Sequence, residues 1–276
     1  MTCTDIAWVD PANADQLKAW DTEEGVFWAE HAALFEHSLH RYDDWLLRAA
    51  GIRDGDRVLD VGCGTGSTTR AAAWLAGSGT ALGVDLSSPM LSVAAELARD
   101  TGAVNATFLQ ADAQVHAFEP FDVILSRTGA TFFADPIAAF TNLERSLKPG
   151  GRVALLVWQP PSQNPWFTDL AAALNLPSPP PDVPGPFALA DAARVAHILT
   201  TAGFPMPECE SLKEPMYLGP DVATAETFVL GVLGWLLMDL DTQARVTLRA
   251  TLQDNLTSEG VTFPSAAWLV TTYKSA

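Results

Sequence analysis

Cysteine is scarce in this chain of 276 residues, and its distribution argues against a protein stabilised by disulfides or by a structural zinc ion. Cys3, Cys63 and Cys209 lie far apart and show neither the spacing of a zinc site nor a disulfide framework. Unpaired thiols in a chain of this size are typical of a reducing compartment. We therefore predict a cytoplasmic protein without a metal site.

Basic residues are also few, because 16 lysines and arginines stand against 33 aspartates and glutamates, for a formal net charge of −17. A nucleic-acid-binding protein gains affinity by neutralising phosphates with Lys and Arg, so this balance argues against that class. The same negative charge disfavours an anionic membrane surface. We expect neither nucleic acid nor a membrane as a partner.

Long hydrophobic runs are missing as well. The longest strongly apolar stretch, residues 228–238, is too short to span a bilayer, which needs about 20 residues. The N-terminus has no basic segment followed by an apolar one, so no signal peptide is visible. What the chain does have is 48% hydrophobic and only 18% charged residues, a composition that excludes disorder and predicts a sizeable core.

Strands and helices alternate through the middle of the chain. The hydrophobic pattern predicts strands at 57–61, 80–84, 106–110, 121–126 and 152–158, with helices at 67–75, 89–99 and 136–147, and two further strands at 206–218 and 266–273. Alternation of this kind is typical of a parallel sheet covered by helices on both faces. We predict an α/β protein with a Rossmann-like, doubly wound, mostly parallel seven-stranded sheet.

The segments outside this alternation are expected to cover it. Residues 24–50 have the periodicity of one helix that ends at Gly51, which predicts a helical N-terminal cap over residues 1–50. Residues 51–276 would form the core. Further helices are expected at 165–174, 189–202, 223–238 and 242–256.

Within the core, two segments are predicted to close over the sheet. Residues 160–187 contain too many prolines for regular sheet, which indicates a lid, and residues 221–257 a helical cap segment. The apolar stretch 228–238 has three open interpretations: a pocket wall, the face of a homodimer, or ordinary core.

A glycine-rich loop at residues 62–66 (Gly-Cys-Gly-Thr-Gly) leads from the first strand into a helix. Its glycines allow a sharp turn and a close approach of a ligand to the backbone. Asp85 follows at the end of the second strand, where a carboxylate can accept hydrogen bonds from ribose hydroxyls. The loop and the acid together indicate a nucleoside-containing ligand.

The details of the loop separate two ligand classes. A dinucleotide fold favours G-x-G-x-x-G with a pyrophosphate at the helix N-terminus, whereas this chain has G-x-G-x-G preceded by Asp60. An acid at that position is unfavourable for a pyrophosphate and suits a cationic group. The pattern therefore favours S-adenosylmethionine over a nicotinamide dinucleotide.

These motifs resemble those of class I S-adenosylmethionine-dependent methyltransferases, in particular the ubiquinone/menaquinone-biosynthesis type that acts on small molecules. The matching segments are 58–66, 83–91, 110–113, 121–127 and 147–151, in the family's order. The resemblance extends over residues 55–158 and does not include the N-terminal helix or the segment after 160. It implies a methyltransferase that uses S-adenosylmethionine and releases S-adenosylhomocysteine.

The resemblance also implies roles for the residues that bind the cofactor. The loop would hold the methionine end with Asp60, Asp85 would bind the ribose, and Asp112 the adenine amino group. Turn capping by Asp112 and helix packing by Met90 remain open as alternatives. The full set of expected cofactor residues is Trp28, Asp60, Gly62, Cys63, Gly64, Gly66, Asp85, Leu86, Met90, Asp112, Ala113 and Ser126.

The loop after the fourth strand lies nearest the methyl group in this scheme and would contact the acceptor. Its aromatic pair, Phe132 and Phe133, would either line the acceptor pocket or pack in the core. We expect a small, apolar acceptor molecule because the covering segments are rich in aromatic residues. The predicted acceptor residues are Arg127, Thr128, Thr131, Phe132, Trp166 and Trp235.

The expected reaction is a direct displacement at the sulfonium, which gains most from proximity and orientation. Oxygen is the acceptor atom that base rates favour, and the sequence identifies no catalytic base. His31, His37 and His40 lack the i, i+4 spacing of a helical metal pair. Two other functions remain possible: a protein that binds the cofactor without catalysis, and a nicotinamide-dependent oxidoreductase.

Overall fold

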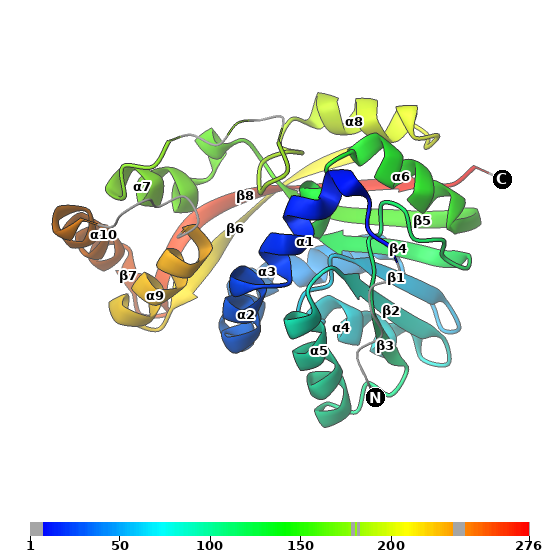
Figure 1. The fold of residues 1–276 in the computed structure, drawn as a ribbon, viewed down its shortest axis with the longest axis horizontal. Helices are drawn as coiled ribbons and strands as arrows, with labels where there is room; N and C mark the ends of the chain where they lie inside the picture. The colour runs from blue at the N-terminus through cyan, green and yellow to red at the C-terminus, as the bar shows by residue number, and fades with distance from the viewer. Residues whose placement is uncertain (1–7, 178–179, 181–182, 234–240, 276) are drawn as a thin grey trace.

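A single eight-stranded sheet organises the computed structural model, which describes residues 8–177, 180, 183–233 and 241–275 (Figure 1). The strand order is β3-β2-β1-β4-β5-β8-β6, and β7 pairs with β8 beside this path. Neighbours among the first five strands run parallel, whereas β8 pairs antiparallel with β5, β6 and β7. The strands are β1 (Arg57–Val61), β2 (Thr80–Asp85), β3 (Ala106–Gln110), β4 (Phe121–Arg127), β5 (Leu147–Trp158), β6 (Glu208–Gly219), β7 (Leu256–Thr257) and β8 (Gly260–Tyr273).

The predicted Rossmann-like fold is confirmed, with one correction to the strand count. The eighth strand is β7, a two-residue strand where the sequence pattern predicted the end of a helix. It pairs with β8, which begins at Gly260 and not at residue 266. Pro264 of β8 lies opposite Pro215 of β6, and because proline cannot donate to a ladder, the pattern before residue 266 did not resemble a strand.

Helices cover both faces of the sheet. On one face, α3 and α4 contribute to a cluster that includes Tyr42, Leu46 and Ala72; on the other, Phe140 of α6 and Ile198 of α8 pack on the inner strands. The helices of this core are α3 (Ala32–Ala50), α4 (Ser67–Ala76), α5 (Ser88–Asp100), α6 (Pro136–Arg145) and α8 (Ala192–Thr201). At α6, Asp135 accepts from the amide of Ala138 at 2.9 Å, which confirms the predicted helix cap.

The N-terminal helix is not continuous, contrary to the expectation for residues 24–50. It divides into α2 (Glu23–Glu30) and α3 at His31, whose backbone leaves the helical region with φ −109° and ψ 22°. The hydrophobic spacing continues across this break, so the pattern alone did not reveal it. A short helix α1 (Ala14–Trp20) and a 3-10 turn η1 (Pro11–Asn13) precede α2.

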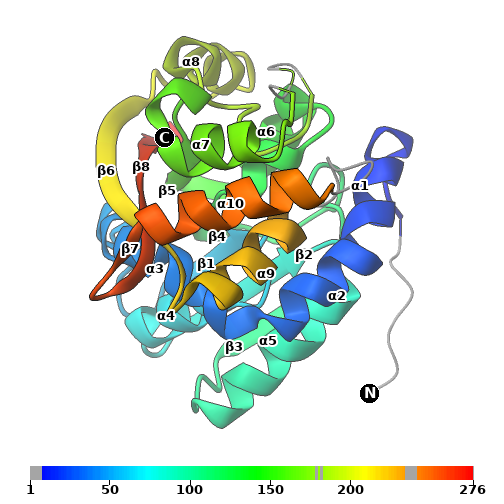
Figure 2. The ribbon, with the colours of Figure 1, turned by 90° about the vertical axis from the view of Figure 1, so that its left-hand side faces the viewer.

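Three helices gather on the outer part of the sheet, beside the long strands β6 and β8 (Figure 2). They are α7 (Pro165–Ala173), α9 (Val222–Leu233) and α10 (Thr242–Asp254). Short 3-10 turns, η2 (Gly129–Phe132) and η3 (Pro161–Gln163), follow β4 and β5. None of the described helices has the length and apolar character needed to cross a bilayer.

Candidate functional site

The glycine loop between β1 and α4 adopts a conformation that favours glycine. Gly62, Gly64 and Gly66 have φ values of 66°, 53° and 77°, in the left-handed region. A Cβ on Gly62 would lie 2.7 Å from the Cα of Gly129, so the two backbones touch. A Cβ on Gly64 would meet only the sulfur of Met90, at 3.7 Å, because this part of the loop faces open space.

Asp85 closes the loop from the end of β2. Its carboxylate accepts hydrogen bonds from the amides of Gly64, at 2.8 Å, and Ser87, at 3.0 Å. Burial raises the pKa of this carboxyl group, and the two amides partly offset that effect. The carboxylate is thus fixed beside the loop at the carboxyl edge of the sheet, where open parallel sheets bind ligands.

Asp60 lies behind the loop and does not line the cavity. Its side chain is fully buried and accepts hydrogen bonds on Oδ2 from Thr68, at 2.7 Å, and Thr69, at 2.6 Å. Burial raises its pKa to about 6, and its Oδ1 has no hydrogen-bond partner among the described residues. Through these two hydrogen bonds Asp60 stabilises the start of α4.

Asp112, after β3, is held by the N-terminal segment. The side-chain amide of Asn13 donates to both of its oxygens, at 3.1 and 2.9 Å, and the amide of Asp10 donates at 3.0 Å. Asn13 also accepts from the amide of Ala134, at 3.0 Å. The sequence analysis did not identify Asn13, because nothing in its local pattern points to a residue 99 positions away.

One cavity joins these elements and contains about 1020 Å³ of space free of protein atoms, part of which opens to solvent. Most of the predicted site residues line it: Trp28, Gly62, Cys63, Gly64, Asp85, Leu86, Met90, Asp112, Ala113, Arg127, Thr128 and Phe132. The lining also includes residues that the sequence analysis did not assign: Asn13, Trp20, Phe35, Glu36, Leu39, Thr65 and Thr68, together with Phe133, whose place was left open.

The other predicted cofactor residues lie outside the cavity lining. Gly66 packs against Phe108, whose ring would be 2.7 Å from an added Cβ. Ser126 is buried, donates to the carbonyl of Val61 at 2.7 Å and accepts from the amide of Ala130 at 3.0 Å. Through these contacts both residues stabilise the backbone next to the cavity.

Two of the predicted acceptor residues, Thr131 and Trp166, also fall outside this lining. The hydroxyl of Thr131 donates to the carbonyl of Thr128 at 2.7 Å. Trp166 is packed in the core against Phe187, and its indole donates to Asn164 at 2.9 Å. Trp235 lies outside the described residues.

Aromatic rings form one wall of the cavity. Trp20 meets Trp28 and Phe132 edge to face, with centroid distances of 5.7 and 5.1 Å. Trp28 stacks on Phe35 at 3.5 Å. Thr128, which also lines the cavity, holds a φ of 64°, an unfavourable conformation for a non-glycine residue that is concentrated at functional sites.

Among the described residues that line the cavity, none is a nucleophile poised for covalent chemistry. Burial and the neighbouring carboxylates raise the pKa of the Cys63 thiol well above its usual range, so the thiol stays protonated. None of His31, His37 and His40 belongs to the cavity lining. Among the residues that the structure describes, no group of three side chains is arranged to hold a metal ion.

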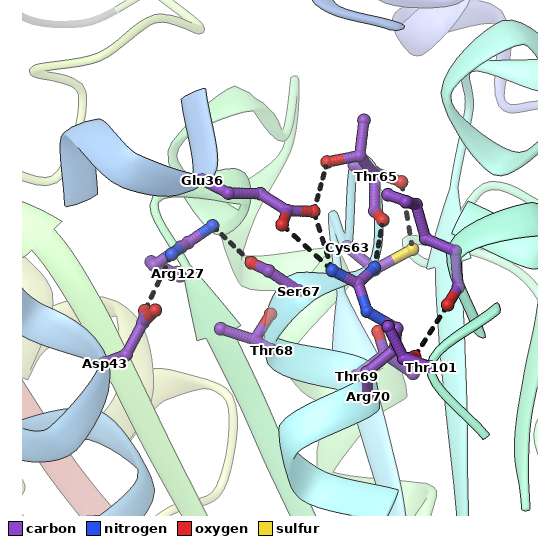
Figure 3. Close-up of polar contacts among 12 residues, drawn as sticks. Glu36, Asp43, Cys63, Thr65, Ser67, Thr68, Thr69, Arg70, Thr101 and Arg127 are labelled. Carbon is purple, nitrogen blue, oxygen red and sulfur yellow. Dashed lines mark hydrogen bonds and ion pairs between the residues drawn. The ribbon is translucent and has the colours of Figure 1, made fainter. Parts of the chain in front are cut away.

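Two ion pairs connect helix α3 to α4 and to the end of β4, next to the glycine loop (Figure 3). Arg70 donates to both oxygens of Glu36 at 2.9 Å and to the carbonyl of Thr65 at 2.8 Å. Arg127 donates to Asp43 and to the hydroxyl of Ser67, each at 2.7 Å. Both pairs are largely shielded from solvent, and burial raises the pKa of Asp43 despite the nearby guanidinium.

The donor set of the cavity fits a nucleoside that carries an amino-acid group. The lining combines a glycine loop with open backbone, the fixed carboxylate of Asp85 and a second carboxylate, that of Asp112. The aromatic wall leaves room for an apolar partner. A pyrophosphate fits poorly, because Glu36, Asp85 and Asp112 line the same space as Arg127.

Comparison with known proteins agrees with this geometry. Residues 58–151 match the family described as a methyltransferase domain. The ubiquinone/menaquinone biosynthesis C-methyltransferase UbiE of Pseudomonas aeruginosa is 34% identical over 136 residues, which are 48% of this chain and 53% of that relative. The chain thus spans about half the length of the curated relatives it matches.

Solved structures share the fold at low sequence identity. The YcgJ protein of Bacillus subtilis has a TM-score of 0.62 and 21% identity, over 86% of this chain and 99% of that one. Phosphoethanolamine N-methyltransferase 2 of Haemonchus contortus, in complex with S-adenosyl-L-methionine, has a TM-score of 0.60 and 20% identity, over 97% and 61%. At such identities the likeness establishes the architecture alone.

Proposed function

We propose that the whole chain, whose residues 58–151 match a methyltransferase domain, transfers a methyl group from S-adenosylmethionine to a small hydrophobic molecule. One observation carries this proposal. The glycine loop, Asp85 and Asp112 line the same cavity as a wall of aromatic side chains, so the two substrates would meet in one partly closed space.

In this proposal the polar half of the cavity binds the cofactor. Asp85 accepts hydrogen bonds from the ribose hydroxyls, and Leu86 and Met90 pack on the adenine. Asp112 accepts from the adenine amino group, with the backbone amide of Ala113 beside it. Asn13 already donates to Asp112, so it would orient that carboxylate toward the base.

The aromatic half binds the methyl acceptor. Trp28, Phe35 and Phe132 would enclose an apolar ring or chain, and Thr128 would offer a polar contact near the reacting atoms. The cofactor supplies an activated methyl group on its sulfonium. The protein's contribution is to exclude water and to align the acceptor, which accounts for most of the rate gain in such a displacement.

The atom that accepts the methyl group is to be identified from the methylated products. Base rates favour oxygen, whereas the curated relative named above is a C-methyltransferase. No histidine lines the cavity among the described residues, and Asp85 and Asp112 are already bonded to amides. An acceptor whose nucleophilic atom is activated by its own ring substituents fits such a site best.

Calorimetry with purified protein tests the proposal. We expect S-adenosylmethionine and S-adenosylhomocysteine to bind at micromolar concentrations, and NAD(H) not to bind. Binding of NAD(H) alone would overturn the proposal in favour of an oxidoreductase. Transfer of a labelled methyl group to members of a panel of hydroxylated and enolisable aromatic compounds, followed by mass spectrometry, would then identify the acceptor atom. Tight cofactor binding without transfer to any acceptor would favour a non-catalytic binding protein.

A further inference from the structure

The amino-acid end of the proposed cofactor carries both an ammonium and a carboxylate. Inside a partly closed cavity each charge needs a partner of opposite sign, because burying an unpaired charge is costly. The sequence analysis assigned this end to the loop backbone and Asp60. Asp60 is fully buried behind the loop and outside the cavity lining, so the structure directs attention to other residues.

Four charged side chains line the cavity in the described part of the chain: Glu36, Asp85, Asp112 and Arg127. Asp85 and Asp112 lie at the ends of β2 and β3, where the ribose and adenine would bind. Glu36 and Arg127 remain, and they have opposite signs. Arg127 is the single cation of this set.

Both residues are positioned at the glycine loop. The hydroxyl of Thr65 donates to Glu36 at 3.2 Å, and Arg127 donates to Ser67 at 2.7 Å. Ser67 is the first residue of α4, whose N-terminus has no side-chain cap. The partial positive charge of that helix end adds to the guanidinium of Arg127 as an environment for a carboxylate.

Each residue is also held from behind by a countercharge outside the cavity lining. Arg70 binds both oxygens of Glu36, and Asp43 binds Arg127 (Figure 3). Arg127 uses two of the five N–H donors of a guanidinium in these bonds, so three have no partner among the described residues. The arrangement fixes the side chains and leaves donors for a ligand.

We propose that Glu36 and Arg127 recognise the amino-acid end of the cofactor, Glu36 by accepting hydrogen bonds from the ammonium and Arg127 by donating to the carboxylate. This inference rests on the proposed function. It moves Arg127 from the acceptor side, where the sequence analysis put it, to the cofactor side. It also makes Asp43 and Arg70 positioning residues that act through their partners.

Three nucleoside ligands separate the two contacts. S-adenosylhomocysteine carries both charges, its decarboxylated analogue keeps the amine alone, and 5′-methylthioadenosine lacks the whole amino-acid group. Glu36→Gln and Arg127→Gln remove one charge each while keeping similar shapes. Arg152→Gln is the matched control, because it breaks a partly buried ion pair with Asp56 away from the cavity.

Calorimetric titration of each variant with each ligand gives the test. We expect Arg127→Gln to weaken binding of S-adenosylhomocysteine about tenfold or more and to leave the other two ligands unchanged. Glu36→Gln is expected to weaken binding of both amine-containing ligands and to spare 5′-methylthioadenosine. Arg152→Gln should change none of the three affinities, and Arg127→Lys should recover part of the loss.

Other results would overturn the inference. Equal loss for S-adenosylhomocysteine and 5′-methylthioadenosine would mean that these residues only support the fold of α3. Unchanged affinity of both variants for S-adenosylhomocysteine would exclude the two contacts. Failure of the wild-type protein to bind S-adenosylhomocysteine would overturn the proposed function as well, which distinguishes the two failures.

Discussion

Asn13 donates to both carboxylate oxygens of Asp112, and this pair fastens the N-terminal segment across one end of the cavity. Asn13 is almost completely buried, at 2% exposure, and it also accepts from the amide of Ala134. A buried side chain with three such bonds is a strong attachment point, because each broken bond would leave a polar group unsatisfied. The segment from Asp10 to Trp20 is therefore part of the cavity wall.

Replacing Asn13 tests this attachment. We expect Asn13→Ala to cost about 1–3 kcal/mol in the local stability of the N-terminal segment, because it leaves the polar partners of Asn13 without their bonds. Hydrogen exchange and limited proteolysis should show earlier opening of residues 8–30. Asp15→Ala, an exposed change two residues further on, should have no such effect. Equal protection in both variants would contradict the attachment.

Asp85 is expected to contribute directly to cofactor affinity. Asp85→Ala should weaken binding of S-adenosylhomocysteine by about 1–3 kcal/mol if the ribose loses its acceptor. The exposed Glu96→Ala on α5 serves as a control for the loss of one negative charge nearby. Titration of both variants, with thermal unfolding to establish that they fold, gives the measurement. Unchanged affinity in folded Asp85→Ala would exclude the ribose contact.

Asp60 predicts a pH dependence of stability whose sign follows from its burial. Its pKa is about 6 in the folded protein against a usual value of 3.8, so between these values the folded state holds a proton that the unfolded chain has released. The free energy of unfolding therefore falls as pH rises through this window and stays lower above it. Asp60→Asn has no proton to lose at this position.

We consequently expect Asp60→Asn to gain roughly 1–3 kcal/mol relative to the wild type between about pH 4 and pH 7. Denaturant unfolding of the ligand-free protein at both pH values measures this difference. The variant keeps an oxygen for the hydroxyls of Thr68 and Thr69, so the comparison isolates the charge. Two stability curves that run parallel across this range would refute the assignment.

Gly66 and Gly102 form a natural pair for separating backbone strain from crowding. Their φ values are similar, 77° and 72°, so alanine at either position costs about 1 kcal/mol in strain. A Cβ at Gly66 would lie 2.7 Å from the ring of Phe108, whereas one at Gly102 meets nothing within 4 Å. Gly66→Ala should therefore be about 1–3 kcal/mol less stable than Gly102→Ala in denaturant unfolding. Equal costs would show that Phe108 yields freely.

The parts of the fold that the sequence predicted are those governed by local pattern. Apolar runs defined the five parallel strands, and the Asp135–Pro136 pair defined the start of α6. The break at His31 escaped prediction because the apolar spacing of α2 continues into α3. The first part of β8 escaped prediction because Pro264 interrupts the local strand pattern. Its pairing with Pro215 of β6 joins residues far apart in the sequence, which a local pattern does not show.

The residues of the candidate site also fall into those that the local pattern predicted and those that it did not. Motif residues such as Gly62 and Asp85 follow from the strand–loop–helix pattern, and the structure brings them to one cavity. Glu36 escaped attention because its helical position resembles that of any polar residue on an amphipathic helix. Trp166 shows the limit of composition, because a proline-rich segment with aromatic residues gives no sign of which ring faces the core.

The hydroxyl of Tyr42, a fully buried residue of α3, lies 2.7 Å from that of Ser265 and accepts from the amide of Glu214 at 3.3 Å. Helix α3, which supplies Phe35, Glu36 and Leu39 to the cavity, thus rests on strands near the other end of the sequence. During synthesis the glycine loop leaves the ribosome long before β6 and β8. The contacts of Tyr42 therefore form only after those strands have been made, later than the ion pair that joins Glu36 of α3 to Arg70 of α4.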